Sequence, residues 1–226
     1  MPFDYQAARE AMVRTLRAEI QDERVLAAFE QVPRERFVPA ELQRYAYEDR
    51  PLPIGHGQTI SQPLMVAIMT QTLGLRSDEK VLEVGTGSGY QSALLSLLAS
   101  EVVSVERVPE LAEAAARRLE LLGYANVRVF TAGDALGWPA EAPYHAIIVT
   151  AGAPDVPSPL VDQLALGGRI VVPVGGRRIQ QLVRATKEEQ GVRIERLGEC
   201  RFVPLISPKG GWPEWEAWTD GDEPSP

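Results

Sequence analysis

The feature that most constrains the fold is a glycine-rich turn set between a strand pattern and a helix pattern. Residues 80–84 form a short apolar run with β-branched members, glycines follow at positions 85, 87 and 89, and residues 90–99 are typical of a buried helix. Glycines let a turn approach a ligand without Cβ collisions, and the start of a helix offers free N–H groups. This order of elements predicts a nucleotide-type cofactor site, and the simpler alternative is a tight turn that binds nothing.

The same alternation of strand and helix patterns continues along the chain. We expect further strands at residues 101–106, 127–130, 144–150 and 169–174, and helices at residues 109–122 and 158–166. Strands separated by helical patterns are typical of βαβ units, which build a mostly parallel sheet covered on both faces.

The two ends of the chain depart from this alternation. Apolar residues recur at helical spacing over residues 4–31, residues 49–63 are rich in proline and glycine and are expected to be a loop, and a helix is expected at 63–73. After residue 174 the helical patterns stop. Strands are expected at 181–186, 192–197 and 201–205, where they would form an antiparallel edge.

The spacing of the glycines indicates which cofactor the turn binds. A dinucleotide fingerprint, G-x-G-x-x-G, would have its third glycine at position 90, but that residue is Tyr90 and the spacing is G-x-G-x-G. Glu83 lies two residues before the first glycine, where its carboxylate could meet a cationic group. S-adenosylmethionine carries an ammonium and a sulfonium, whereas NAD carries a pyrophosphate. The pattern therefore favours S-adenosylmethionine.

Two further acidic residues follow predicted strands. Glu106 ends the second strand, where an acid can accept hydrogen bonds from both ribose hydroxyls, although it could also be an exposed strand end. Gly133 and Asp134 follow the third strand. Asp134 could accept a hydrogen bond from an adenine amino group or could cap a turn.

Residues 51–63, Pro-Leu-Pro-Ile-Gly-His-Gly-Gln-Thr-Ile-Ser-Gln-Pro, resemble the segment that precedes the core of protein-L-isoaspartate O-methyltransferases. Further stretches resemble the same family in order, at residues 32–39, 83–90, 147–151, 163–169, 172–175 and 202–205. The resemblance runs from about residue 5 to residue 206, and Gln58–Pro63 is specific to this family among methyltransferases. Ala135 and Gly152 depart from it, because the family commonly has a glycine and an alanine there.

The resemblance implies an α/β fold of the Rossmann-like class I methyltransferase type. This is a mostly parallel, doubly wound sheet with an antiparallel C-terminal edge and an N-terminal helical segment. We expect a single domain over residues 1–206, in which residues 1–75 hold the helical segment and the substrate loop and residues 76–206 form the cofactor-binding core. Residues 207–226 are an acidic tail rich in tryptophan and proline. Its Trp212, Trp215 and Trp218 could dock on the body of the protein or form a loose tail.

The reaction that the resemblance implies moves the methyl group of S-adenosylmethionine to the free α-carboxylate of an L-isoaspartyl residue in a damaged protein or peptide. D-aspartyl residues are poorer substrates, and the methyl ester collapses to a succinimide whose hydrolysis partly restores a normal aspartyl bond. The active-site serine of the family corresponds to Ser61, which could instead, or in addition, cap the helix that begins near Pro63. The expected substrate-binding residues are His56, Thr59, Ile60, Ser61 and Gln62. The expected cofactor-binding residues are Glu83, Gly85, Thr86, Gly87, Ser88, Gly89, Glu106, Gly133, Asp134 and Thr150.

This chemistry needs no general base, because a carboxylate with a pKa near 4 is already ionised at neutral pH. Positioning and partial removal of water from the nucleophile are what help. A hydroxyl of Ser61 or Thr59 can hold one carboxylate oxygen while the other attacks. His56 would have little to do as a base and is expected to be structural or to line the substrate site.

Composition excludes several other classes of protein. The net charge of −8 argues against a nucleic-acid partner, and no run approaches the roughly 18–20 apolar residues of a membrane span. A single cysteine, Cys200, excludes an internal disulfide and a multi-cysteine metal site, and the opening residues lack a signal-peptide pattern. We therefore expect a cytoplasmic protein without a metal site, and a monomer is the default expectation. A methyltransferase acting on a small-molecule carboxylate or hydroxyl, a nicotinamide oxidoreductase and a non-catalytic scaffold are the alternatives.

Overall fold

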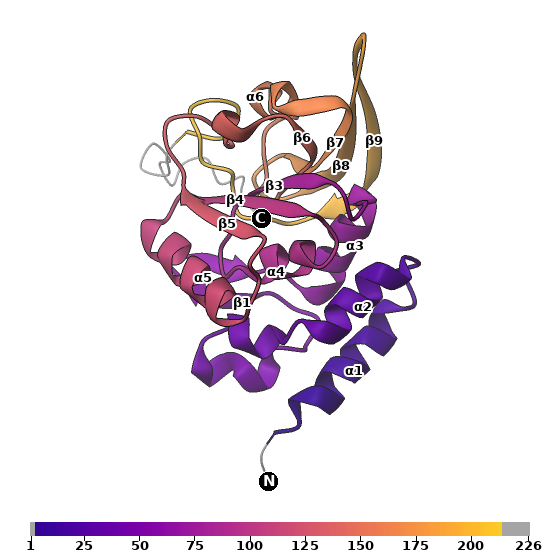
Figure 1. Cartoon of the computed structure of the whole chain (residues 1–226), viewed down its shortest axis with the longest axis vertical. Coiled ribbons are helices and arrows are strands. Elements are labelled where there is room, and N and C mark those ends of the chain that lie inside the picture. The colour runs from indigo at the N-terminus through magenta and orange to yellow at the C-terminus, as the bar shows by residue number, and fades with distance from the viewer. Residues whose placement is uncertain (1–2, 214–226) are drawn as a thin grey trace, which may run out of the picture.

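The computed structural model describes residues 3–213, which are built around one central β-sheet (Figure 1). Within these residues the sheet has seven strands in the order β5-β4-β3-β6-β7-β8-β9. Their bounds are β3 (Lys80–Val84), β4 (Glu101–Glu106), β5 (Val127–Thr131), β6 (Tyr144–Val149), β7 (Leu164–Gly175), β8 (Gln180–Glu188) and β9 (Gly191–Cys200). The pairs from β5 to β7 are parallel, and β8 and β9 add the antiparallel edge that the sequence predicts.

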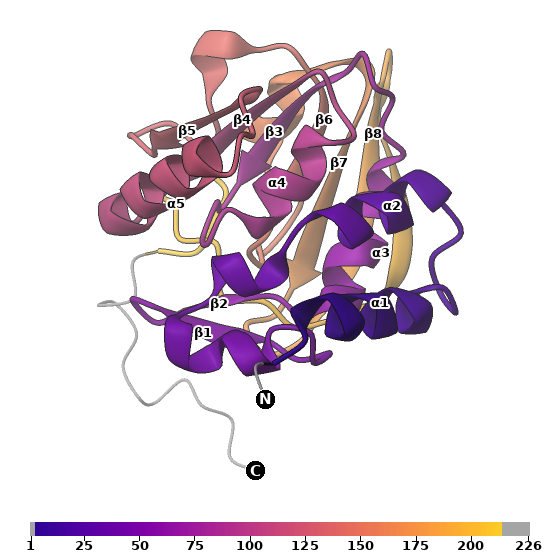
Figure 2. The same cartoon turned by 60° about the horizontal axis from the view of Figure 1, so that its bottom comes forward.

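The helices cover the two faces of the sheet unequally. Five lie on one face, namely α1 (Tyr5–Leu16), α2 (Glu23–Gln31), α3 (Pro63–Leu73), α4 (Tyr90–Ser96) and α5 (Pro109–Leu121) (Figure 2). The other face is covered by α6 (Ser158–Asp162) and by loop residues such as Leu136 and Leu205. Two buried clusters of apolar side chains result, one on each side of the strands.

Helix boundaries follow from local side chains. Asp4 and Asp22 accept hydrogen bonds from the amides of Ala7 and Arg24, both at 2.9 Å, and so cap α1 and α2. The predicted helical segment 4–31 is thus divided in two. Gly74 ends α3 in the left-handed conformation, with φ +56°.

A buried ion pair fixes the C-terminal end of α3 to the sheet. Arg169 on β7 donates from Nη1 and Nη2 to Glu79 at 2.7 and 2.6 Å, and also donates to the carbonyl oxygens of Leu73 and Gly74 at 2.5 and 2.8 Å. The side chains of both charged residues are almost fully buried. These bonds hold α3 in place at the end of the sheet where the parallel strands begin.

The prediction for residues 49–63 was wrong in part, because the segment contains a hairpin. Strands β1 (Leu52–Gly55) and β2 (Gln58–Ile60) pair antiparallel, and the turn between them places Gly55, His56 and Gly57 at positive φ. Proline and glycine make this segment look like a loop. Only Pro53 lies within a strand, however, and both strands of a two-stranded hairpin are edge strands, where a missing N–H is tolerated. Around it lie the short 3₁₀ helices η1 (Arg34–Phe37) and η2 (Ala40–Tyr45), and η3 (Pro139–Glu141) precedes β6.

Two boundaries near the end of the core also differ from prediction. The helix expected at 158–166 ends at Asp162, because Leu164 already pairs with Tyr144 as the start of β7. The strand expected at 201–205 is absent from the described residues, where β9 ends at Cys200 and Pro204 forms only an isolated bridge to Gly152.

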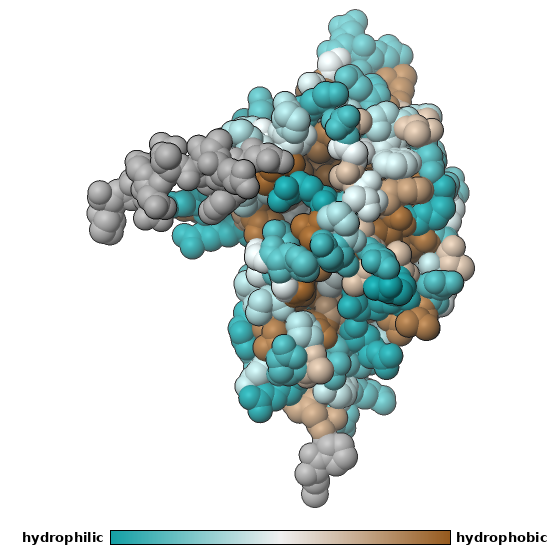
Figure 3. Space-filling model, turned by 90° about the vertical axis from the view of Figure 1, so that its left-hand side faces the viewer, coloured by the Kyte–Doolittle hydropathy of each residue, from teal (hydrophilic) through white to brown (hydrophobic). Residues whose placement is uncertain are grey.

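The described part of the tail begins against the body of the protein. The amide of Trp212 donates to the carbonyl of Leu205 at 2.7 Å, and the amide of Ser207 donates to the carbonyl of Trp212 at 2.9 Å. Predictions about Trp215 and Trp218 lie outside the described residues. Hydrophilic and apolar residues are intermixed on the side shown in Figure 3. Among residues 3–213, no helix has the length and apolarity needed to cross a membrane.

Candidate functional site

A cavity of about 720 Å³ opens at the C-terminal ends of β3, β4 and β6. This is the edge at which ligands bind in open α/β sheets, and the volume is that of a small-molecule site. Its wall combines segments far apart in the chain, namely Gln58–Ser61, Gly85–Ser88, Glu106–Val108, Ala132–Gly137, Thr150–Ala151 and Phe202–Lys209. The cavity thus joins the predicted cofactor turn and the predicted substrate loop in one space.

The glycine turn is held in a shape that side chains would prevent. Gly85, Gly87 and Gly89 have φ of +100°, +53° and +86°. A Cβ at position 85 would lie 2.3 Å from Thr150 Oγ1, and one at position 87 would lie 3.3 Å from the tip of Ile54 on β1. The turn therefore packs directly against β6 on one side and against the β1–β2 hairpin on another.

Glu106 braces the turn from the end of β4. Its Oε2 accepts a hydrogen bond from the amide of Gly87 at 2.8 Å, and its Oε1 accepts one from the amide of Val108 at 2.9 Å. Each carboxylate oxygen can accept a second hydrogen bond, and Glu106 lines the cavity. The side chain can therefore position the turn and still receive ligand hydroxyls.

Glu83 lies behind the turn, since it is fully buried and is not part of the cavity wall. Its Oε2 accepts hydrogen bonds from the hydroxyls of Ser92 on α4 and Ser104 on β4, and the Ser104 hydroxyl lies 2.5 Å from that of Thr86 in the turn. Oε1 has no partner among the described residues. Burial raises the pKa of Glu83 to about 8, with a smaller contribution from Glu106. The sequence suggests that Glu83 contacts a cationic ligand directly. In the structure its side chain lies behind the glycine turn, which separates it from the cavity.

Ser61 lies between β2 and α3 and lines the cavity. The helix-capping alternative is not realised, because the N-cap of α3 is Gln62 and its first turn is capped by Asp49, whose Oδ1 accepts from the amide of Leu64 at 2.8 Å. The carbonyl of Ser61 accepts a hydrogen bond from Arg34 Nη2 at 2.7 Å. This bond holds the backbone of Ser61 in position at the cavity wall.

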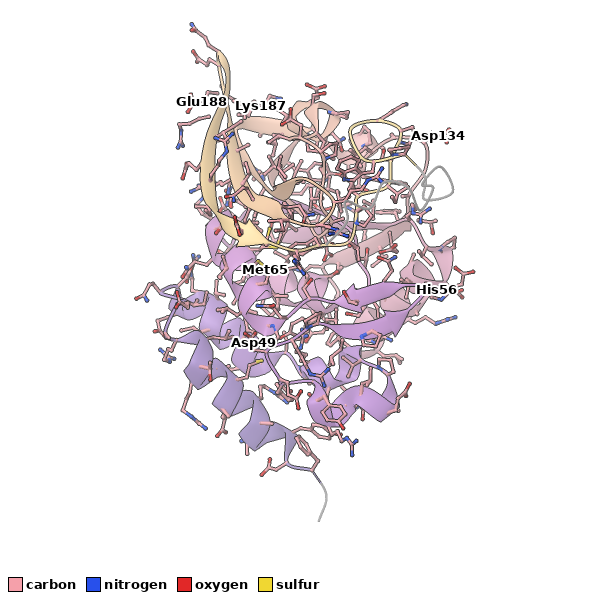
Figure 4. The ribbon with its side chains drawn as sticks, turned by 180° about the vertical axis from the view of Figure 1, so that it is seen from behind. Asp49, His56, Met65, Asp134, Lys187 and Glu188 are labelled. Atoms are coloured by element: carbon pink, nitrogen blue, oxygen red, sulfur yellow. The ribbon has the colours of Figure 1, made fainter. Side chains whose placement is uncertain are left out.

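The remaining predicted residues divide into two groups. Thr59, Ile60, Thr86, Ser88, Gly133, Asp134 and Thr150 line the cavity together with Ser61 and Glu106. Gly89, Gln62 and His56 do not, and His56 lies exposed in the hairpin turn (Figure 4). Figure 4 also shows Asp134 on the loop after β5, on the same side of the molecule as His56. No group of histidine, cysteine, aspartate and glutamate able to hold a metal occurs within residues 3–213.

Sequence reasoning assigned no role to residues 202–209, which close one side of the cavity. The amide of Gly152 donates to the carbonyl of Val203 and the amide of Leu205 donates to the carbonyl of Gly152, both at 2.8 Å. Residues 202–205 belong to the stretches that carry the family resemblance. They were predicted to form an edge strand, and an edge strand gave no reason to expect them in the wall of the cavity. Arg34 also lies in a stretch that resembles the family, residues 32–39, but nothing in the sequence pattern indicates a chemical role for it.

The cavity fits S-adenosylmethionine in size and in chemistry. It offers carboxylates at Glu106 and Asp134 for hydroxyl and amino groups, hydroxyls at Thr86 and Ser88, and a turn with room for close approach. The buried carboxyl of Glu83, whose pKa of about 8 keeps it mainly protonated at neutral pH, supports the turn through the hydroxyls of Ser104 and Thr86.

Comparison with known proteins agrees with these features. Residues 7–210 match the protein-L-isoaspartate(D-aspartate) O-methyltransferase family. A protein-L-isoaspartate O-methyltransferase of Methanoculleus marisnigri is 55% identical over 193 residues, which cover 85% of this chain and 87% of the relative. One from Syntrophobacter fumaroxidans is 53% identical over 212 residues, which cover 93% and 99%.

Solved structures give the same result and confirm the class I methyltransferase fold. A protein-L-isoaspartate O-methyltransferase structure superposes with a TM-score of 0.79 and 32% identity, over 89% of this chain and 67% of the other. A Plasmodium falciparum structure assigned to the same activity, in complex with S-adenosyl-L-homocysteine, has a TM-score of 0.75 and 28% identity, over 88% and 97%. The chain is therefore a member of the protein-L-isoaspartate(D-aspartate) O-methyltransferase family.

Proposed function

We propose that this protein transfers the methyl group of S-adenosylmethionine to the free α-carboxylate of L-isoaspartyl residues, and more weakly of D-aspartyl residues, in damaged proteins and peptides. The methyl ester then forms a succinimide, which starts repair. One observation carries the proposal beyond family membership. A single cavity contains both the glycine turn and the hydroxyls of Thr59 and Ser61, so a cofactor and an acceptor can meet there.

S-adenosylmethionine supplies an activated methyl group on its sulfonium. Glu106 would accept hydrogen bonds from its ribose hydroxyls, and Asp134 would accept one from its adenine amino group. The glycine turn presents its backbone to the rest of S-adenosylmethionine. Further contacts are assigned to Gly85, Thr86, Gly87, Ser88, Gly133 and Thr150. Gly89 shapes the turn with its φ of +86°, and Glu83 supports the turn from behind through Ser104.

Ser61 holds the acceptor. Its hydroxyl donates to one oxygen of the substrate carboxylate, assisted by Thr59, and the other oxygen attacks the methyl carbon. A carbon–oxygen bond forms, the carbon–sulfur bond breaks with its electron pair passing to sulfur, and no proton is transferred. The carboxylate is ionised at neutral pH, so the protein contributes alignment and exclusion of water.

The acidic residues of the cavity are kept apart from this second carboxylate. Glu106 and Asp134 lie with the cofactor turn and the loop after β5, whereas Thr59 and Ser61 come from the β1–β2 hairpin and its exit. Amides already satisfy one hydrogen bond to each Glu106 oxygen, which reduces its repulsion of an incoming anion.

Residues 1–206 act as one domain in this proposal. The partners are proteins and peptides with isoaspartyl residues, recognised by the backbone lesion and not by a particular sequence. His56, Ile60 and Gln62 belong to the surface around the acceptor. The protein works as a monomer in the cytoplasm, without a nucleic acid, a membrane or a metal.

A matched pair of synthetic peptides tests this function. One peptide contains L-isoaspartate, the other normal aspartate, and both are incubated with labelled S-adenosylmethionine. Base-labile methyl transfer to the isoaspartyl peptide alone is the expected result. Intact cofactor binding with transfer to neither peptide would point instead to a small-molecule carboxylate or hydroxyl as acceptor.

A further inference from the structure

A fully buried arginine lies directly behind Ser61. Arg34, in η1, donates from Nη2 to the carbonyl of Ser61 and from Nε to the carbonyl of Ala46, both at 2.7 Å. Its guanidinium carbon lies 4.7 Å from the centre of the Tyr90 ring, and Tyr90 lines the cavity. The guanidinium of Arg34 thus contacts both Ser61, which is proposed to bind the methyl acceptor, and Tyr90, the first residue after the glycine turn.

This charge is not neutralised by an ion pair. Among the described residues, no carboxylate pairs with Arg34, and its Nη1 is buried without a hydrogen-bond partner. Burial lowers the pKa of Arg34, and this shift is opposed by Tyr90 first, then by Tyr47 and by the carboxylate of Asp49. Arginine nevertheless stays protonated in proteins, and the cost of burying its charge is offset here only in part, by the two hydrogen bonds to carbonyl oxygens and the contact with the Tyr90 ring.

The other basic residues of the cavity are poorly placed for that task. Within the described residues that line it, these are Arg107 and Lys209, and both are exposed to solvent. Water and salt screen exposed charges much more than buried ones. Arg34, in contrast, is fully buried and bonds directly to the backbone of Ser61, so protein and not solvent lies between its charge and that residue.

We infer that Arg34 makes this site select an anionic acceptor, by holding the backbone of Ser61 in place and by supplying unscreened positive charge behind its hydroxyl. It is a positioning and specificity residue, not a catalytic one, because it does not line the cavity. The inference rests on the proposed function and adds a physical basis for preferring a carboxylate over a neutral group of the same shape.

The test compares two isopeptide ligands that differ only in carrying an α-carboxylate or an α-carboxamide. Their affinities are measured by calorimetry with S-adenosylhomocysteine present. Wild-type protein is expected to prefer the carboxylate, and Arg34→Met to reduce that preference by about tenfold or more, because one charge acting at short range through protein is removed. Arg36→Met is the matched control, since Arg36 lies exposed in the same 3₁₀ helix. It should leave the preference and the activity unchanged.

A purely structural role for Arg34 predicts different results. In that case Arg34→Met would weaken both ligands equally, which would overturn the inference. The binding constant for S-adenosylmethionine should stay within about twofold in Arg34→Met, because, within the described residues, Arg34 reaches the cofactor side only through the Tyr90 ring and makes no hydrogen bond to the glycine turn.

A measurement on the wild-type protein guards against a variant that does not fold. Preference for the carboxylate should change little between about 0.02 and 0.5 M ionic strength if a buried charge creates it. A preference that disappears in high salt would assign it to Arg107 and Lys209 and contradict the inference. Methyl transfer to the isoaspartyl peptide is measured first, and its absence in the wild type would remove the proposed function and the inference together.

Discussion

Thr150 and Gly85 meet where β6 and β3 end, and the Thr150 hydroxyl leaves no room for a side chain at position 85. The Thr150 hydroxyl donates a hydrogen bond to the carbonyl of Gly85 at 2.6 Å, while a Cβ on Gly85 would lie 2.3 Å from the same hydroxyl oxygen. Gly85 also has φ +100°, which side chains disfavour. The first glycine of the turn is thus required by a neighbouring strand as well as by any ligand.

Gly85→Ala should destabilise the protein by about 2–5 kcal/mol, the sum of backbone strain and steric overlap. Adding Thr150→Ala should recover part of this loss, because the overlap disappears while the strain remains. Urea unfolding of the two single variants and the double variant measures the coupling. Strictly additive effects would show that Thr150 does not restrict position 85.

Ser61→Ala should lower turnover of an isoaspartyl peptide by about tenfold to a thousandfold, the range for loss of one positioned donor. The dissociation constant for S-adenosylmethionine should be nearly unchanged, because the hydroxyl is assigned to the acceptor. Ser77→Ala, at an exposed site before β3, is the control for loss of a hydroxyl. Equal weakening of cofactor binding by Ser61→Ala would sink the assignment.

Glu106→Ala should weaken binding of S-adenosylmethionine by roughly 1–3 kcal/mol, because buried acceptors for the ribose hydroxyls are lost. The substitution also removes the acceptors for Gly87 and Val108. Glu106→Gln therefore helps to separate the effects, since it keeps the shape and one carbonyl oxygen. Unaltered affinity in both variants, measured by calorimetry, would show that Glu106 is not the ribose ligand.

The raised pKa of Glu83 should make the stability of the folded protein depend on pH. Its pKa is about 8 in the folded protein and near 4.5 when unfolded, so between these values the folded state keeps a proton that the unfolded state releases. The stabilisation from the protonated carboxyl is complete below pH 4.5 and is lost as the pH rises towards 8, at about 1.4 kcal/mol per pH unit.

Glu83→Gln removes this titration while keeping the side-chain shape. The free energy of unfolding of the variant, relative to wild type, should therefore rise by several kcal/mol between about pH 5 and pH 8. Chemical denaturation at both pH values provides the difference, in which other titrating groups cancel. A difference that does not depend on pH would mean that Glu83 is already ionised at pH 5.

Local sequence patterns predicted the core elements well where the spacing of apolar side chains agrees with the proline and glycine residues at the ends of the element. The strands at residues 80–84 and 101–106 occur as expected, because continuous apolar runs between helices indicate buried parallel strands. The helix at 63–73 also matches, with Pro63 at its start and Gly74 after its end. Local patterns failed for β1 and β2, where proline and glycine obscure a hairpin stabilised by packing on the turn.

The amino-acid sequence by itself determined the order of elements, the glycine turn and the family to which the chain belongs, since these follow from short-range periodicity and motif. Only the tertiary structure decided which way the functional side chains face. Strand pleating directs Glu83 towards Ser92 of α4 instead of into the cavity. Folding also brings Arg34 onto the carbonyl of Ser61. Such contacts join residues distant in the chain, and their geometry depends on the packing of the whole sheet and its helices.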